Sequence, residues 1–167
     1  MYRLELSRLW RRPTLLAALA LVSLLIIAAP LPAARADERA RDVETLMADY
    51  TRMWSAKDAH SIWTRLYRLD PGQPFRSEED LSNEFKRLIA FGYDHTDLQS
   101  VSACLFTPKA ALAVLRFRRV KGDGTPLNSR DQAMAYFLRQ FDDGWRITAL
   151  LPFSPSARLE CASTTDP

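Results

Sequence analysis

The sequence is poor in the residues on which many enzymes and cofactor sites depend. Among 167 residues there are only 2 histidines, 2 cysteines and 5 glycines. His60 and His95 have no second His or Cys at ligand spacing, so we expect no metal site. The glycines form neither a phosphate-cradling loop nor a nucleotide fingerprint, and no serine-hydrolase motif is present. We therefore expect no cofactor and none of these chemistries.

The N-terminus carries a long apolar run. Met1–Arg12 holds four arginines against one glutamate, and Thr14–Ala29 is then almost wholly apolar. Ala34–Ala36 has the small-x-small form of a cleavage site. We predict a Sec-type signal peptide over residues 1–36, cleaved after Ala36, and hence a secreted or periplasmic protein. The alternative is an uncleaved segment that tethers the domain to a membrane. We expect the protein to contact a membrane only through such a segment.

Removal of this segment changes the charge balance. The whole chain has 23 basic and 20 acidic residues, a net charge of +3. Residues 1–36 contain five arginines and one glutamate, so the mature chain keeps 18 basic and 19 acidic residues, a net charge of −1. A nearly neutral mature chain gives no reason to expect a nucleic-acid partner.

The two cysteines of the mature chain have two open roles. In an oxidising compartment Cys104 and Cys161 can form one intramolecular disulfide, which would fasten the C-terminal tail, residues 154–167, to the rest of the domain. The alternative is a buried strand thiol at Cys104 and a separate tail thiol at Cys161.

Three amphipathic helices are predicted in the first half of the mature chain. Apolar residues recur at helical spacing over residues 39–55, and Asp58 is placed to cap a second, shorter helix. A third helix begins at Ser77, where Ser77 and Asp80 stand at capping-box spacing, and it ends before Gly92. The apolar face of this third helix is predicted to consist of Leu81, Phe85, Leu88 and Ile89.

After the third helix the apolar period changes to two, which indicates four antiparallel strands. The first two cover Leu98–Phe106 and Ala110–Val120, and the last two form a hairpin over Met134–Phe153 around Asp142–Gly144. Alternation in the last strand places four residues on one face: Trp145, Ile147, Ala149 and Leu151. Helices followed by strands predict a single α+β domain at residues 37–153, with three N-terminal helices packed on a curved antiparallel sheet.

Two short segments resemble a known superfamily. Tyr50–Ile62, YTRMWSAKDAHSI, is similar to a pattern common in the nuclear transport factor 2-like (NTF2-like) superfamily, and Gly144–Ile147, GWRI, is frequent there. That superfamily includes the SnoaL-like proteins and ketosteroid isomerase, and the resemblance covers roughly Asp42–Pro152. It implies a cone-shaped fold in which a strongly curved sheet wraps the helices and leaves an apolar cavity. It also implies a homodimer as one expectation, because dimers are common in the superfamily.

The resemblance to ketosteroid isomerase implies two candidate catalytic residues. Tyr50 matches the position of the oxyanion-hole tyrosine and would donate a hydrogen bond to a carbonyl or enolate oxygen. Asp70, before Pro71, resembles the Asp-Pro context of the catalytic base. The place of the isomerase's protonated aspartate falls near Phe137, so the full set is not reproduced and we do not predict isomerase activity. A helix-face tyrosine and a turn aspartate are the alternative roles.

The aromatic residues are more informative about function. Five aromatic residues are predicted to lie between the helices and the sheet and to bind a ligand there: Tyr50, Trp54, Trp63, Tyr67 and Tyr136. The alternative is that they fill this space completely. Arg116, Arg118 and Arg119 would suit an anionic ligand or form a solvated strand face.

These observations lead to one functional expectation and two alternatives. We expect the domain to bind a small hydrophobic ligand or a protein partner without catalysis. One alternative is a small cofactor-free isomerase or lyase that uses Tyr50 and Asp70. The other is a membrane-tethered periplasmic assembly component, like the related periplasmic domains of type IV secretion systems.

Overall fold

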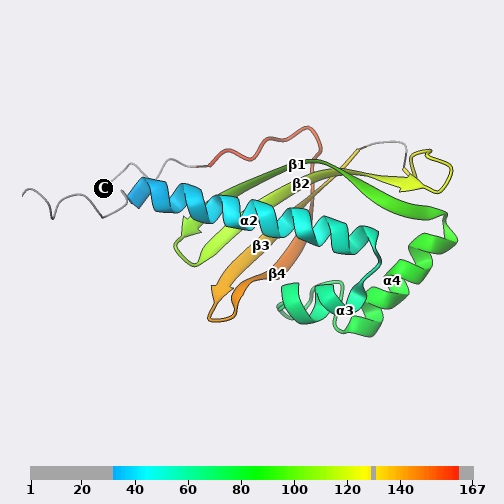
Figure 1. Ribbon diagram of the computed structural model, residues 1–167, viewed down its shortest axis with the longest axis horizontal. Coiled ribbons are helices and arrows are strands. Elements are labelled where there is room, and N and C mark those ends of the chain that lie inside the picture. The colour runs from blue at the N-terminus through cyan, green and yellow to red at the C-terminus, as the bar shows by residue number, and fades with distance from the viewer. Residues whose placement is uncertain (1–31, 129–130, 162–167) are drawn as a thin grey trace, which may run out of the picture. The chain divides into compact units, whose positions relative to one another are not determined.

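A computed structural model describes residues 32–128 and 131–161 of the chain (Figure 1). The predicted signal peptide lies mostly outside these residues, and its apolar run Thr14–Ala29 lies wholly outside them. Within the described part of the chain, no helix combines the length and apolar character needed to cross a membrane. The described residues from Arg35 onward form one compact unit.

The first helix, α2 (Pro32–Ser55), begins earlier than the predicted range 39–55. None of the side chains from 35 to 42 is buried, and the first buried one is Val43. An exposed turn carries no apolar period, so the pattern did not reveal these first turns. The predicted cleavage point after Ala36 precedes the buried side chains of this helix.

A short break separates α2 from the second helix, as predicted. Lys57 has a φ of 57°, in the left-handed region that ends a right-handed helix. Asp58 then caps α3 (Ala59–Ser61), because its side chain accepts a hydrogen bond from the Ser61 N–H at 2.9 Å. This helix continues directly into a π-helical turn, η1 (Ile62–Leu66).

The third helix, α4 (Glu78–Ala90), is confirmed together with its cap. The Ser77 hydroxyl accepts from the Asp80 N–H at 3.1 Å, and the Asp80 carboxylate accepts from the Arg76 N–H at 2.8 Å. The predicted apolar face is wrong at Ile89, which is 51% exposed because it lies one residue further round the helix than the buried stripe. The buried residues of α4 are Leu81, Phe85 and Leu88.

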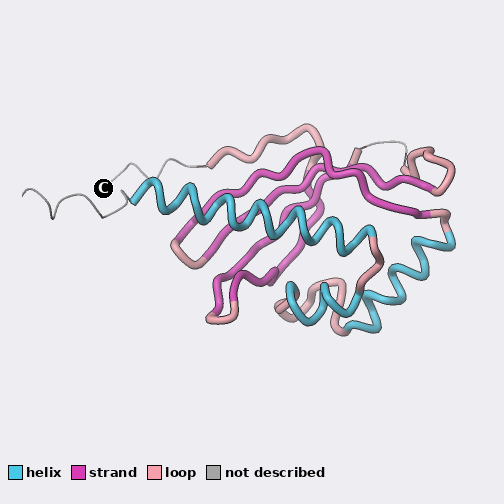
Figure 2. Tube along the Cα trace, viewed as in Figure 1, coloured by secondary structure: helices cyan, strands magenta, loops and turns pink. Residues whose placement is uncertain are grey.

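The four predicted strands form an antiparallel sheet in the order β1-β2-β3-β4 (Figures 1 and 2). Their bounds are β1 Tyr93–Thr107, β2 Ala110–Lys121, β3 Gln132–Phe141 and β4 Gly144–Phe153. The strand β1 starts before the predicted Leu98, because its first residues are mostly polar and show no apolar alternation. Three helices and a curled antiparallel sheet confirm the predicted α+β class.

The last strand contains an irregularity that the sequence pattern did not predict. In the pairing of β3 with β4, Thr148 is the extra residue of a β-bulge. A bulge shifts the following residues to the opposite face of the sheet. As a result Leu151 is 48% exposed, whereas Leu150 packs against the core. The predicted alternation is therefore wrong beyond Ile147.

The two faces of the sheet are covered differently. The helices pack on the inner face, while residues 157–161 lie on the outer face (Figure 1). The Arg116 guanidinium donates a hydrogen bond to the carbonyl oxygen of Ala157 in this segment. Cys104 and Cys161 are joined by a disulfide, with their Cα atoms 5.3 Å apart, which is one of the two roles that the sequence left open.

Candidate functional site

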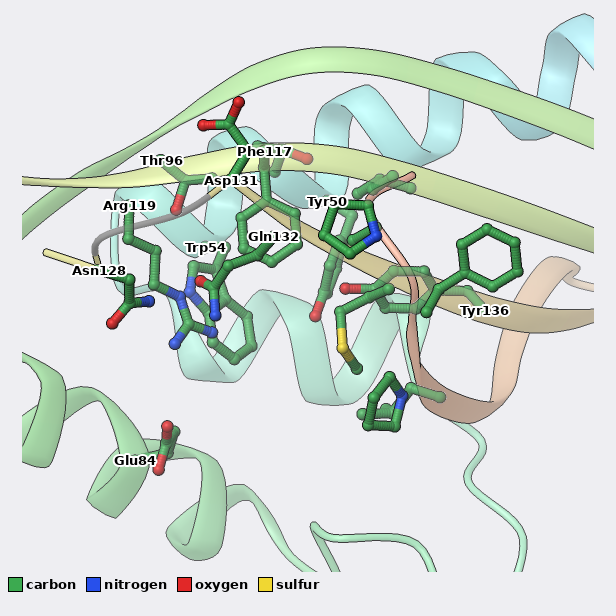
Figure 3. A pocket seen from close by; sticks show the side chains of 18 of the residues that line it. Tyr50, Trp54, Glu84, Thr96, Phe117, Arg119, Asn128, Asp131, Gln132 and Tyr136 are labelled. Carbon is green, nitrogen blue, oxygen red and sulfur yellow. The ribbon is translucent and has the colours of Figure 1, made fainter. Parts of the chain in front are cut away.

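A cavity of about 550 Å³ lies between α2 and the inner face of the sheet (Figure 3). This volume is in the range of small-molecule pockets, about 300–1,000 Å³. Most of its wall is apolar or aromatic: Tyr50, Trp54, Phe75, Leu115, Phe117, Ala133, Met134, Tyr136, Leu150, Pro152, Phe153 and Pro155. Its polar wall residues are Thr51, Glu84, Thr96, Arg119, Asn128, Asp131 and Gln132.

Three of the five residues predicted to bind a ligand line this cavity, namely Tyr50, Trp54 and Tyr136. Tyr67 lies behind them, with its hydroxyl 2.9 Å from that of Tyr50, and it does not reach the wall. Trp63 is half-buried, packs its ring 6.1 Å from that of Tyr67, and is also absent from the wall. The structure therefore brings part of the predicted set together around the cavity.

Asp70, the second candidate catalytic residue, is not brought to Tyr50. After η1 the chain runs beside the edge of β4, where the Arg68 N–H donates to the Ile147 carbonyl at 2.9 Å. The Asp70 N–H donates to the Thr148 carbonyl at 2.8 Å. The Asp70 side chain is exposed and is not part of the cavity wall. This edge pairing separates the two candidate catalytic residues.

The buried tyrosines form a cluster at one side of the cavity. The rings of Tyr50 and Tyr136 meet edge to face with centroids 5.3 Å apart. Burial raises the pKa of Tyr50 well above its usual value of 10.0, and the neighbouring Tyr67 adds to this rise. Burial likewise raises the pKa of Tyr67 and of Tyr136. At neutral pH these hydroxyls are therefore protonated and can donate hydrogen bonds, but they cannot act as phenolate bases.

The polar end of the cavity is centred on Arg119 (Figure 3). Arg119 stands opposite Thr96 in the β1–β2 pairing, and Gln132 stands opposite Phe117 in the β2–β3 pairing. The Arg119 guanidinium carbon is 5.7 Å from the ring centroids of both Trp54 and Phe117. The Nε of Arg119 and the Oε1 of Gln132 are buried without a hydrogen-bond partner in the described part of the chain. An unpaired buried polar atom costs about 1–3 kcal/mol, so a ligand that pairs these atoms would recover part of that energy.

Two carboxylates also border this end, but each is paired with an arginine of its own. Glu84 lies 2.7 Å from Arg87, and Asp131 lies 2.7 Å from Arg118. Among residues 32–128 and 131–161, no carboxylate forms an ion pair with Arg119. The charge of Arg119 is therefore the uncompensated one at this end of the cavity.

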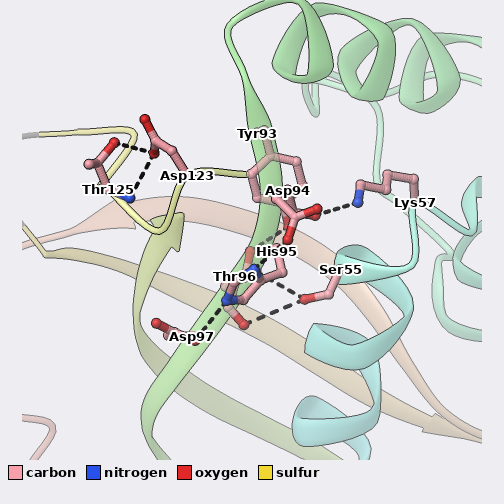
Figure 4. A network of polar contacts seen from close by, with 9 residues as sticks. All are labelled: Ser55, Lys57, Tyr93, Asp94, His95, Thr96, Asp97, Asp123 and Thr125. Atoms are coloured by element: carbon pink, nitrogen blue, oxygen red, sulfur yellow. Dashed lines mark hydrogen bonds and ion pairs between the residues drawn. The ribbon is translucent and has the colours of Figure 1, made fainter. Parts of the chain in front are cut away.

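A polar network fastens the end of α2 to the start of β1 (Figure 4), and its Thr96 stands opposite Arg119 in the β1–β2 pairing. The Ser55 hydroxyl accepts a hydrogen bond from the Thr96 N–H at 3.1 Å. The Thr96 hydroxyl is 2.6 Å from the Tyr93 hydroxyl. The Lys57 ammonium donates to the carbonyl oxygen of Asp94. These bonds hold Thr96 in place at the polar end of the cavity.

The histidines lie outside the cavity wall. In Figure 4, His95 lies between two aspartates of β1, with Nδ1 2.8 Å from Asp94 and Nε2 3.2 Å from Asp97. His60 contacts Glu78 at 3.2 Å on the surface. The described residues contain no group of three or more His, Cys, Asp or Glu side chains placed to hold a metal ion.

Arg119 was not distinguished by sequence from the two other arginines of its strand, Arg116 and Arg118. Arg116 binds the C-terminal segment and Arg118 pairs with Asp131. Arg119 is the one of the three that lines the cavity. The sequence does contain a signal for this position. Side chains alternate between the two faces of a strand, so Arg119 shares a face with the apolar core residue Phe117.

Comparisons with known proteins agree on the type of fold. Residues 76–155 match the family model described as NTF2-like protein (DUF6841). No curated protein matches the chain significantly. Among solved structures, the chain is similar to an NTF2-like superfamily protein from Salmonella enterica serovar Typhimurium, with a TM-score of 0.53 and 15% identity over 70% of this chain and 91% of that one.

A second solved structure gives the same result. The chain is similar to a domain of unknown function with a cystatin-like fold from Nostoc punctiforme, with a TM-score of 0.50 and 14% identity over 66% of this chain and 73% of that one. At such identities the likeness shows the fold and not the activity.

Proposed function

We propose that this chain, which has the NTF2-like fold, is an exported domain that binds a small apolar ligand between α2 and the sheet without catalysis. The observation that carries this proposal is the cavity of about 550 Å³ with its mostly apolar wall. Apolar ligand surface buried there contributes about 25 cal/mol per Å² before the costs of association are subtracted. A few polar groups at one end would orient the ligand.

Export is supported by the signal-like pattern of residues 1–36 and by the Cys104–Cys161 disulfide, since disulfides persist in oxidising compartments. Protein recovered from the periplasm or the medium should begin at Asp37 when its N-terminus is sequenced. An intact N-terminus recovered with the membrane would instead favour the tethered alternative.

A function without catalysis is supported by the position of Asp70. An isomerase of the kind that the resemblance implies needs a carboxylate base beside Tyr50, whereas Asp70 lies exposed at the edge of β4. The substitution Asp70→Asn should therefore leave ligand binding unchanged. Turnover of a bound ligand that stops in Asp70→Asn would show that the protein is an enzyme.

Native mass spectrometry of protein purified from its own compartment tests the binding function. We expect a retained small molecule that is lost on denaturation. The variant Leu115→Trp replaces an aliphatic wall side chain by a bulky indole ring and should lose the molecule. The control Phe137→Trp changes a half-exposed residue outside the wall and should retain it. The proposal fails if the protein carries no molecule and also binds no 1-octanol in solution.

A further inference from the structure

We propose that the ligand of this cavity carries an anionic group, such as a carboxylate, that binds Arg119, while its apolar body extends toward Met134 and Leu150. This inference rests on the proposed function and names the class of ligand. It follows from the charge, the unpaired atoms and the aromatic surroundings of the polar end.

The charge at the polar end favours an anion. Arg119 lines the cavity and forms no ion pair within the described residues. The nearby carboxylates of Glu84 and Asp131 each lie 2.7 Å from another arginine. An incoming cation would meet Arg119 with its charge uncompensated, whereas an anion would neutralise it.

The unpaired atoms favour an oxygen acceptor at the same place. The buried Nε of Arg119 is a donor without a partner among the described residues, and a carboxylate oxygen can accept from it. Gln132 also presents a buried, unpartnered amide oxygen. A half-turn of this amide presents its NH₂ group instead, so Arg119 and Gln132 can both donate to one carboxylate. A neutral oxygen would satisfy these donors but would leave the charge of Arg119 uncompensated.

The surroundings strengthen such a contact. The rings of Trp54 and Phe117 flank the Arg119 guanidinium, each with its centroid 5.7 Å from the guanidinium carbon. These rings displace water from part of the guanidinium, and ionic hydrogen bonds gain strength where water is excluded. Figure 3 shows Arg119 and Gln132 at one end of the cavity and Tyr136 further along. A ligand with one charged end and an apolar body matches this division.

The test compares octanoate with 1-octanol, which has the same chain length but no charge at neutral pH. Binding is measured by isothermal titration calorimetry on the wild type, Arg119→Met, Arg119→Lys and the control Arg139→Met. Arg139 is an exposed arginine of β3 outside the cavity wall, so its variant loses the same charge elsewhere. Octylamine serves as the cationic probe, and circular dichroism checks that each variant is folded.

In the wild type we expect octanoate to bind at least tenfold more tightly than 1-octanol and octylamine to bind most weakly. Arg119→Met should remove this preference, Arg119→Lys should retain part of it, and Arg139→Met should retain all of it. Equal binding of octanoate and 1-octanol by the wild type, or an unchanged preference in Arg119→Met, overturns the inference while the proposed function stands. Binding of neither probe overturns both.

Discussion

The interior between α2 and the sheet has two halves that differ in how they are filled. On the inner face of β2, Ala111 and Ala113 are 1% and 0% exposed and belong to the closely packed half. Further along the same strand, Leu115, Phe117 and Arg119 line the cavity. The cavity therefore lies where the inward side chains of β2 are largest, and close packing occurs where they are smallest.

This difference indicates that the cavity is made by the backbone rather than by missing side chains. Small alanines allow a helix to approach a sheet closely. At the other end the pairing of β1 with β2 is irregular, with a register shift between Leu98 and Ser100, beside Phe117 and Arg116. Bulges bend a strand and increase its twist, which moves the sheet away from a straight helix. We expect such a cavity to persist when a single wall side chain is truncated.

Truncation of one side chain in each half should produce the largest difference in the free energy of unfolding. Leu138 is buried in the packed half of β3, and Met134 on the same strand borders the cavity. We expect Leu138→Ala to lower the free energy of unfolding by about 2–5 kcal/mol, because a new hole forms in a close-packed region. Met134→Ala should cost less than about 2 kcal/mol, because its side chain already borders empty space. Equal losses in urea denaturation would contradict the difference between the two halves.

Enlargement of one side chain in each half should produce a smaller difference in the free energy of unfolding. Ala113→Leu forces extra atoms into the packed half and should cost about 1–3 kcal/mol of unfolding free energy. Leu115→Phe adds volume to the cavity wall and should change stability by no more than about 1 kcal/mol in either direction. Thermal unfolding of both variants under the same conditions provides the measurement. A Leu115→Phe protein as unstable as Ala113→Leu would mean that the cavity does not accept a larger wall residue.

The smallest expected effect concerns the buried tyrosines and appears only at alkaline pH. Burial raises the pKa of Tyr50 above 10.0, so the unfolded chain releases this proton at lower pH than the native protein does. The contribution of the buried Tyr50 hydroxyl to the free energy of unfolding is therefore complete below about pH 10. As the pH rises further, this contribution falls by about 1.4 kcal/mol per pH unit. We expect stability above pH 10 to fall less steeply in Tyr50→Phe than in the wild type, as measured by urea denaturation from pH 8 to 11. Equal slopes would show that Tyr50 ionises freely in the native protein.

The elements of the fold that depend on local chemistry could be predicted from the sequence. Asp58 and Ser77 cap the second and third helices as expected, because a side-chain oxygen before an apolar periodic run acts within one turn. The early start of α2 and the polar start of β1 were missed, because exposed residues carry no apolar period. The bulge at Thr148 was missed because it depends on the pairing of β4 with β3 and not on β4 alone.

The candidate site could be predicted only in part for the same reason. Tyr50, Trp54 and Tyr136 reach the cavity as the aromatic pattern indicates. Asp70 was placed by resemblance, but its backbone pairs with the edge of β4 and carries the carboxylate away from the cavity. The role of Arg119 depends on which of three neighbouring arginines faces inward, and this is decided by strand register and by the partners of the other two.

Methyl NMR of the methionines tests most directly whether the hollow half of the interior is a binding site. The chain has four methionines, of which Met134 lines the cavity and Met47 is fully buried in the core. With methyl-labelled methionine, titration with 1-octanol should shift the Met134 signal saturably and leave the Met47 signal in place. Substitution of Met134 by leucine assigns the shifted signal. If the Met134 signal stays unchanged at saturating 1-octanol, or if both signals shift equally, the cavity is not the ligand site.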